Sequence, residues 1–346
     1  MINKIWAKAN SHKLQIANGL KPVPIHNNFV QLCEILQSFA LKTHANPHKT
    51  FTKKSLNLPQ ISKNRILEKS KNRKIQNKKM SKTILITGAS SGIGKSIGEY
   101  LTLKGHTVYG TSRNPERITD SKFLLVALDV RNTESIQNAV AEIIQKSGRI
   151  DVVINNAGVG ITGPLEEIPT LEIKNNFETN FFGPIEVMKA VLPQMRSQKS
   201  GLIINITSIA GYMGLPYRSV YSASKGALEL ITEALRMEVK EFGIHITNVA
   251  PGDFATNIAS GRFHAPLIKG SAYEKPYGNT LKMMDEHVNS GSNPNEMAIA
   301  IHKIIETPVP KVHYKVGVFM QKFSIVLKRI LPDKVYEKML MNHYKL

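Results

Sequence analysis

The chain has 346 residues, enough for one or two domains, and its formal net charge of +20 is distributed unevenly. Residues 1–79 hold 16 Lys and Arg against two Glu, whereas residues 80–346 hold 30 against 24 acidic residues. The single cysteine, Cys33, excludes a disulfide framework and a cysteine-based metal site, so we expect a cytoplasmic protein without a metal. Neither a secretory signal nor a run of ~18 apolar residues that could span a membrane is evident.

The first 79 residues are rich in Lys and Asn and differ in composition from the rest of the chain. One helix is predicted at 29–41, while residues 42–79 have too few apolar side chains for a core and are predicted to be disordered. We favour the interpretation that Met80 is the natural start and that residues 1–79 are upstream sequence. The alternatives are a basic arm for nucleic acid or anionic lipid and an organelle transit peptide. A nucleic-acid partner is therefore not expected.

A strand, a glycine-rich turn and a helix come next. Residues 83–87 are apolar or β-branched, and residues 95–104 have the spacing of an amphipathic helix. Between them, Gly88 permits a tight turn, Gly92 lets the backbone approach a pyrophosphate, and Gly94 lets the helix pack close to the strand. The phosphates would lie at the N-terminal end of the helix, beside its free N–H groups. This arrangement predicts a dinucleotide-binding unit.

The end of the second predicted strand, residues 107–111, indicates which dinucleotide is bound. Ser112 and Arg113 follow this strand. An acidic residue here would bind the ribose hydroxyls of NAD, whereas an arginine accommodates the 2′-phosphate of NADP. Because the carboxylate is absent, we expect NADP(H) rather than NAD(H).

Two further strands are predicted at 123–128 and 152–154, with a helix at 134–146 between them. Asparagines follow the fourth strand and can hold the turn open. The small residues Ala157 and Gly158 come next and would let a ribose lie close to the backbone.

The stretch from Ser208 to Lys225 has groups suited to proton transfer. It follows a buried strand at 202–206, and Tyr221 and Lys225 lie one turn apart at the start of a helix predicted over 221–242. A phenol titrates near ~10, and an ammonium one turn away favours its phenolate. The Ser208 hydroxyl can stabilise charge on a carbonyl oxygen. A Tyr–Lys pair at this spacing also occurs on ordinary solvated helices.

Residues 253–292 are predicted to be irregular, followed by a helix at 294–306 and a strand at 311–318. The irregular segment is rich in large apolar and aromatic side chains. They indicate either an apolar, bulky substrate or ordinary packing of the segment on the domain. The side chains concerned are Phe254, Phe263, Pro266, Leu267, Tyr273, Tyr277, Met283 and Met284.

The C-terminal tail, residues 319–346, combines apolar and basic side chains in a helical pattern. It could lie on a membrane surface as a peripheral contact, cap the substrate site or pack against a neighbouring subunit. We favour capping or packing, because the charges are few and Pro332 interrupts the helix.

These motifs occur in an order that resembles the short-chain dehydrogenase/reductase family, in its single-domain branch, over residues 81–318. The tail resembles the C-terminal extensions of steroid- and retinol-dehydrogenase-like members. The resemblance implies an α/β fold, with a Rossmann-type, doubly wound, seven-stranded parallel sheet covered by helices on both faces. It also implies one catalytic domain at 80–318 and, commonly, homo-oligomers. The matching motifs are 87–94, Asp129-Val130, 155–158, Asn180, Ser208, Tyr221 with Lys225, and Pro251-Gly252.

The resemblance assigns roles to individual residues. Tyr221 would exchange the proton, Lys225 would assist it and hold the nicotinamide ribose, and Ser208 would polarise the substrate oxygen. Asn180, in a kink of the long helix after the fourth strand, would hold a water of the proton relay. The cofactor would be bound by Gly88, Ser90, Ser91, Gly92, Ile93, Gly94, Ser112, Arg113, Asp129, Val130, Asn156, Ala157, Gly158, Tyr221, Lys225, Pro251, Gly252 and Thr256.

The expected function is reversible hydride transfer between a nicotinamide cofactor and a small-molecule carbonyl or alcohol. An apolar ketone or a steroid-, retinoid- or lipid-like compound is the expected substrate class. The alternative is a catalytically silent protein that keeps the dinucleotide fold for sensing or scaffolding.

Overall fold

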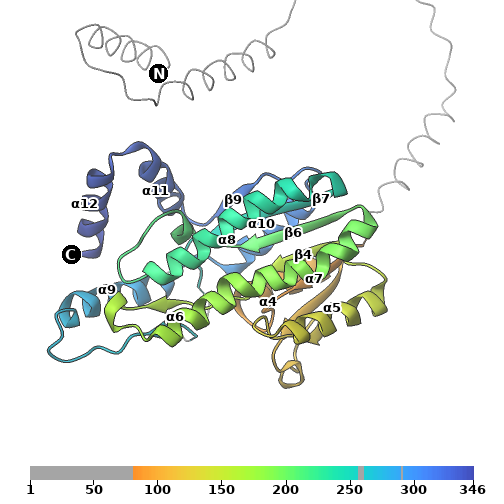
Figure 1. Ribbon diagram of the computed structural model, residues 1–346, viewed down its shortest axis with the longest axis horizontal. Helices are drawn as coiled ribbons and strands as arrows, with labels where there is room; N and C mark the ends of the chain where they lie inside the picture. Colours follow the sequence, from red (N-terminus) through yellow and green to blue (C-terminus); the bar gives the residue numbers. More distant parts are fainter. Residues whose placement is uncertain (1–80, 256–260, 290) are drawn as a thin grey trace, which may run out of the picture. The chain divides into compact units, whose positions relative to one another are not determined.

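A computed structural model describes residues 81–255, 261–289 and 291–346 (Figure 1). The predicted N-terminal extension and Thr256 lie outside these residues. The centre of the fold is a seven-stranded parallel sheet, as predicted, and its strands lie in the order β3-β2-β1-β4-β6-β7-β9. Its strands are β1 (Thr83–Ile86), β2 (Thr107–Ser112), β3 (Leu124–Ala127), β4 (Val152–Asn155), β6 (Gly201–Ile206), β7 (Ile244–Pro251) and β9 (His313–Val316).

Helices cover both faces of the sheet, which explains why the central strands are apolar on both sides. Ile84 and Ile86 of β1 pack with α4 and α10, whereas Leu85 packs with α5 and α7 on the other face. Figure 1 shows α7 and α8 crossing the sheet. These helices are α4 (Gly92–Leu103), α5 (Thr133–Ser147), α7 (Gly183–Gln198), α8 (Ser219–Glu238) and α10 (Pro294–Ile305).

The chain reverses its direction of travel across the sheet between β1 and β4. It moves outward from β1 to β3, crosses back, and continues from β4 to β9 on the other side. The loops that follow β1 and β4 therefore lead away from each other at the carboxyl ends of these two strands. Open parallel sheets bind their ligands at such a point.

The prediction that residues 253–292 are irregular was wrong. Helix α9 (Glu274–Asn289) lies in this segment, and β8 (Phe263–His264) pairs with β5 (Ile161–Thr162) in a second, two-stranded sheet. Tyr273, Tyr277 and Leu281 follow one another at four-residue intervals, the spacing of one helix face, and Tyr277 is fully buried. Of the large side chains singled out in this segment, Tyr277, Met283 and Met284 belong to α9, and the burial of Tyr277 supports packing as its role.

The C-terminal tail forms two helices, α11 (Phe319–Ile330) and α12 (Asp333–Tyr344), with Pro332 between them. Ile325 of α11 and Tyr336 of α12 are buried and pack with Ile209 and Met213, which follow β6. Among the helices of the described ranges, none has the length and apolar character needed to cross a membrane.

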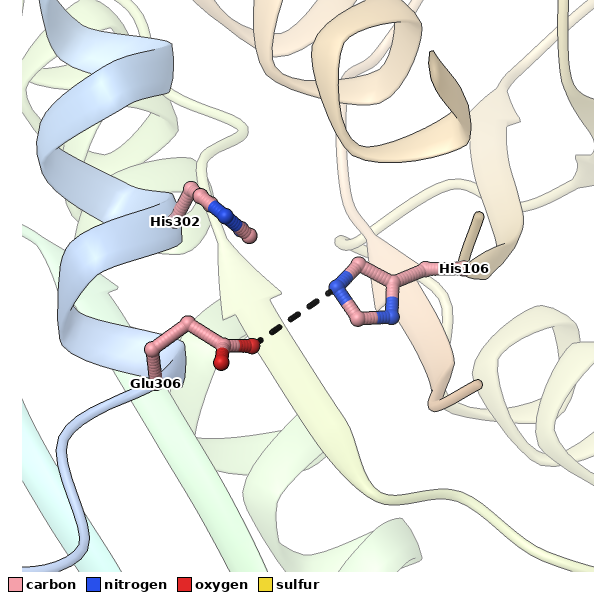
Figure 2. A group of neighbouring side chains, drawn as sticks. All are labelled: His106, His302 and Glu306. Atoms are coloured by element: carbon pink, nitrogen blue, oxygen red, sulfur yellow. Dashed lines mark ion pairs between the residues drawn. The ribbon is translucent and has the colours of Figure 1, made fainter. Parts of the chain in front are cut away.

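A polar cluster lies at the amino-terminal edge of the sheet and joins it to α10 (Figure 2). Nitrogen and oxygen atoms of His106, His302 and Glu306 lie within 4.8 Å of one another. The backbone N–H of Lys82 donates to Nδ1 of His106 at 3.2 Å, so the neutral ring carries its proton on Nε2, 4.0 Å from a Glu306 oxygen. A metal at Nε2 would have to displace that proton. The geometry therefore favours a polar contact between the neutral His106 ring and the Glu306 carboxylate, where α10 meets the sheet.

Candidate active site

A cavity of about 610 Å³ lies at the carboxyl ends of the strands. Its walls come from the ends of β2, β6 and β7, the turns after β1, β3 and β4, and the start of α8. It brings together most of the residues predicted to bind a dinucleotide. Of those residues, Gly88, Ser90, Ser91, Gly92, Ile93, Ser112, Arg113, Asp129, Val130, Asn156, Ala157, Gly158, Tyr221, Lys225 and Pro251 line it.

The glycine turn is held against the end of β4 by hydrogen bonds. The Asn156 side-chain amide donates to the carbonyl oxygens of Thr87 and Gly88, both at 3.0 Å. Gly88 has a φ of +64°, and Gly94 lies so close to the turn that a Cβ there would clash with the Gly88 carbonyl oxygen and Asn156. Gly94 does not line the cavity, in keeping with its predicted packing role. The Asn156 amide is therefore used in shaping the turn.

The N-terminus of α4 opens into this cavity and suits an anionic group. Its first residue is Gly92, its first turn contains no acidic residue, and no side chain caps its free N–H groups. Unpaired N–H groups and the positive end of the helix dipole attract phosphate oxygens. The cavity thus fits the pyrophosphate of a dinucleotide.

Cationic side chains gather at the end of the cavity near β2 and β3. Arg113 follows β2 as predicted, and Arg131, which the sequence reasoning missed, lines the same end. Arg131 pairs with Asp129 at 3.5 Å, and both side chains are about one-third exposed or more. The signal was present in the sequence, because Arg131 comes directly after the Asp129-Val130 motif.

Tyr221 connects the large cavity with a smaller one of about 70 Å³. Ser208 and Gly252 line the smaller cavity and not the larger one. Ser208 is buried, and its Oγ accepts a hydrogen bond from the Ala210 backbone N–H at 3.1 Å, so its own O–H proton stays available to a ligand. Two hydroxyl donors, of Ser208 and Tyr221, thus share one cavity wall.

Lys225 is buried one turn along α8 from Tyr221. Its Nζ donates to the Ile206 carbonyl oxygen at 2.9 Å, which fixes the ammonium against the end of β6. Burial lowers the pKa of Lys225 to about 8, because the charged form loses solvation. The side chain reaches the large cavity, where a polar ligand would restore part of that solvation.

Asn180 lies in a π-helical segment, Glu178–Phe182, between α6 (Thr170–Phe177) and α7, so the predicted kink is present. Its side chain is fully buried and holds the loop after β4: Oδ1 accepts from the Val159 N–H at 2.8 Å, and Nδ2 donates to the Val159 carbonyl at 2.9 Å. Nδ2 also donates to Ser224 Oγ at 3.2 Å. Asn180 does not line either cavity. A water held nearby stays a prediction.

Arg218 is a further residue of this site that the sequence reasoning missed. Its guanidinium lies over the Tyr221 ring, 5.6 Å from the ring centroid, and it lines the smaller cavity. It also lies near Tyr344 at the end of α12, where its positive charge acts on the tyrosine hydroxyl. The C-terminal helix therefore contacts the candidate catalytic tyrosine through one side chain, a link between distant residues that no motif predicts.

A buried carboxyl group lies one turn beyond Lys225. Glu229 accepts a hydrogen bond from Thr207 Oγ1 at 2.9 Å and also pairs with Tyr212. Burial raises the pKa of Glu229 to about 7, mainly because its charged form is desolvated. Thr207 lines the large cavity, so this titrating group is one side chain removed from the site.

Known proteins with similar sequences and folds agree with this geometry. The family model described as short chain dehydrogenase matches residues 82–266. A 3-ketodihydrosphingosine reductase of Bacteroides thetaiotaomicron is 42% identical over 262 residues, covering 75% of this chain and 97% of the relative. The crystal structure of a short-chain dehydrogenase from Streptomyces avermitilis has a TM-score of 0.67 at 32% identity, covering 77% of this chain and 97% of the other.

A further solved structure, a short-chain dehydrogenase from Burkholderia cenocepacia in complex with NADP, shares the fold. Its TM-score is 0.59 at 24% identity, over 76% of this chain and 97% of that protein. The chain belongs to the short-chain dehydrogenase/reductase family and is an oxidoreductase of that family.

Proposed function

We propose that the protein reduces the ketone group of a long-chain, lipid-like substrate with NADPH, in a reversible reaction. The observation that carries the proposal is the position of Tyr221, which lines both the dinucleotide-shaped cavity and the smaller cavity beside it. A proton donor between the two cavities suits transfer between a cofactor in one and a carbonyl in the other. The intact Ser208, Tyr221 and Lys225 favour turnover over a silent sensing role.

NADP is the proposed cofactor. Arg113 and Arg131 line the end of the cavity beyond β2, and no acidic residue stands at 112–114 to bind ribose hydroxyls. Guanidinium groups bind phosphate oxygens with paired hydrogen bonds, so these two side chains suit a 2′-phosphate. Asp129 is held by Arg131, which reduces the repulsion that its carboxylate would exert on that phosphate.

In the proposed mechanism, the nicotinamide cofactor supplies the hydride when bound. The Ser208 hydroxyl donates a hydrogen bond to the substrate carbonyl oxygen, and Tyr221 gives its phenolic proton to that oxygen as negative charge develops there. The buried Lys225 ammonium, fixed by the Ile206 carbonyl, stabilises the phenolate that remains. In oxidation the Tyr221 phenolate accepts the proton of the alcohol.

The proposed substrate class draws on the relative from Bacteroides thetaiotaomicron, which is named for reducing 3-ketodihydrosphingosine. The similarity extends over 97% of that relative. Phe254 and Ile161 line the smaller cavity beside Ser208 and provide apolar contacts. We therefore select 3-ketodihydrosphingosine as the first compound to assay, with a ketoacyl thioester and a short methyl ketone as comparisons.

The test is Tyr221→Phe in the full chain, with NADPH oxidation followed on these three ketones. We expect kcat to fall about 1,000-fold while NADPH binding and thermal stability are retained, because only the transferable proton is removed. Tyr273→Phe, a tyrosine that lines neither cavity, is the control and should keep full activity. Undiminished turnover by Tyr221→Phe would contradict the mechanism, and equal kcat/KM on all three ketones would contradict the substrate class.

A further inference from the structure

The outer face of α11 presents a continuous apolar stripe to solvent. Phe319, Phe323, Val326 and Ile330 are 71%, 37%, 40% and 72% exposed. Their spacing of four, three and four residues places all four on one side of the helix. The rings of Phe319 and Phe323 stack, with centroids 5.6 Å apart, so two aromatic side chains form one flat surface. A solvent-facing stripe of this kind marks a surface that another body covers.

The charge of the domain is concentrated around this helix. Residues 311–346 contain eight Lys and Arg against two acidic residues, whereas residues 81–310 contain 22 of each and are neutral. Lys322 and Arg329 are seven residues apart on α11, along one flank of the stripe. An apolar stripe bordered by basic side chains is the pattern of a helix that lies in the interface of an anionic membrane.

The inner face of the same helix is fastened to the substrate end of the site. Gln321 Nε2 donates to an Asp253 carboxylate oxygen at 2.6 Å, and the Asp253 backbone N–H donates to Gln321 Oε1 at 3.2 Å. Asp253 lines the smaller cavity. Ile325 is buried against Ile209 and Met213. Whatever covers the stripe therefore lies one helix thickness from the cavity in which the substrate is proposed to bind.

We propose that the stripe of α11 binds the surface of an anionic lipid bilayer. Two other occupants conflict with the charges. A second copy of the chain would bring two segments of net charge +6 together, which repel each other, and residues 1–79 add no compensating charge because their own net charge is +14. Phosphate headgroups compensate the basic flank, while the stacked phenylalanines reach the acyl boundary.

This binding is independent of catalysis and is measured without substrate or cofactor, so its failure and that of the proposed reaction are distinguishable. Where both hold, the membrane presents a long-chain substrate beside the cavity. This consequence rests on the proposed function. The preference for capping or subunit packing, based on sequence, stays a prediction. The inner face of α11 packs on the domain, and the present proposal concerns the face that is left exposed.

The decisive experiment places a fluorescent probe in the stripe. Phe323→Trp is made in the full chain together with Trp6→Phe, which removes the natural tryptophan. Vesicles of phosphatidylglycerol and phosphatidylcholine with brominated acyl chains quench a tryptophan that inserts among the lipids. The control is Leu103→Trp in the same background, a site on α4 that is 81% exposed. We expect quenching at 323 and none at 103; absence of quenching at 323 overturns the proposal.

A binding measurement complements the probe. It is designed to suppress electrostatic binding of vesicles by the basic residues 1–79, which are present in every variant. Phe319, Phe323, Val326 and Ile330 are all changed to Ser, and vesicle binding is compared in 0.5 M salt, where the Debye length is ~4 Å and purely electrostatic attachment is weak. We expect the partition coefficient to fall about tenfold or more. Unchanged vesicle binding would show that the stripe does not bind the membrane. If light scattering showed a loss of oligomers while vesicle binding was retained, the stripe would instead contact another protein surface.

Discussion

The cofactor end and the substrate end of the site are built differently. At the cofactor end, backbone turns after parallel strands form the walls, and Thr87 and Asn156 lock two of these turns together. At the substrate end, segments distant in sequence meet through single side-chain contacts, such as Gln321 with Asp253. The first kind of wall follows from local sequence, whereas the second exists only when the chain has folded. Substitutions at the cofactor end should therefore have large effects, and these effects should be confined to cofactor binding.

The largest effect is expected at the glycine turn. Gly94→Ala places a methyl group against the Gly88 backbone carbonyl and the Asn156 amide, which is held in place by its hydrogen bonds to the Thr87 and Gly88 carbonyls. We expect the turn to shift and NADPH affinity to fall by about 100-fold, which corresponds to ~2.7 kcal/mol. Calorimetric titration measures this change. Gly214→Ala, where a Cβ meets nothing within 4 Å, is the matched control. Equal affinities of both variants would refute the close-packed turn.

The next effect concerns the charge at the same end. Arg113→Ala should raise the Kd for NADPH about tenfold and leave that for NADH nearly unchanged, because only NADPH has the 2′-phosphate. Arg117→Ala removes a charge from the same loop without touching the cavity and should alter neither Kd. If Arg113→Ala weakened both cofactors equally, the preference for NADP would lose its main support.

At the substrate end, a smaller effect tests the link between α12 and Tyr221. Arg218→Gln removes the cation over the Tyr221 ring, a contact worth about 1 kcal/mol, so we expect kcat to fall about fivefold. Tyr344→Phe removes only the hydroxyl group near Arg218 and should cause a smaller fall. Arg196→Gln is the control, because Arg196 lies over the Phe242 ring in the same way, away from both cavities. Identical kcat in all three variants would exclude the link.

Glu229 lies between the two ends, and its removal should change stability more than activity. Because its pKa rises from 4.5 to about 7 on folding, the folded state binds the proton more tightly, and stability is lost as the pH rises through this range. Glu229→Gln should therefore be more stable than the wild type at pH 8, by on the order of 2 kcal/mol, and similar to it at pH 4. Urea unfolding at both pH values measures this. Glu238→Gln, an exposed residue on the same helix, should show no such difference.

Most of the fold could be predicted from the sequence, because its strands and helices have strong local patterns. The residues of β1 are apolar on both faces, and Gly148 ends α5 with a positive φ of 70°. Helix α9 was missed because the large side chains of 253–292 were considered for substrate contact or packing and not for helical spacing. The position of Arg131 in the cavity was missed as well, although it adjoins a recognised motif.

Other features had no local signal. Arg218 contacts Tyr221 within one helical turn, but its proximity to Tyr344 brings together residues 126 positions apart. The amides of Asn156 and Asn180 are used to hold backbone turns, and a sequence does not reveal which partner an amide selects. Such contacts depend on where the strand ends are brought together.

The sequence by itself determined six of the seven strands, the glycine turn and the residues available for proton transfer, because periodicity and glycine spacing act over a few neighbouring residues. The order of its motifs carried the resemblance that implied the family and the seven-stranded sheet. The tertiary structure alone decided that Tyr221 lies between two cavities, that burial lowers the pKa of Lys225 to about 8, and that one face of α11 stays exposed. These properties depend on which surfaces distant segments cover, and solvent exclusion is a property of the folded chain as a whole.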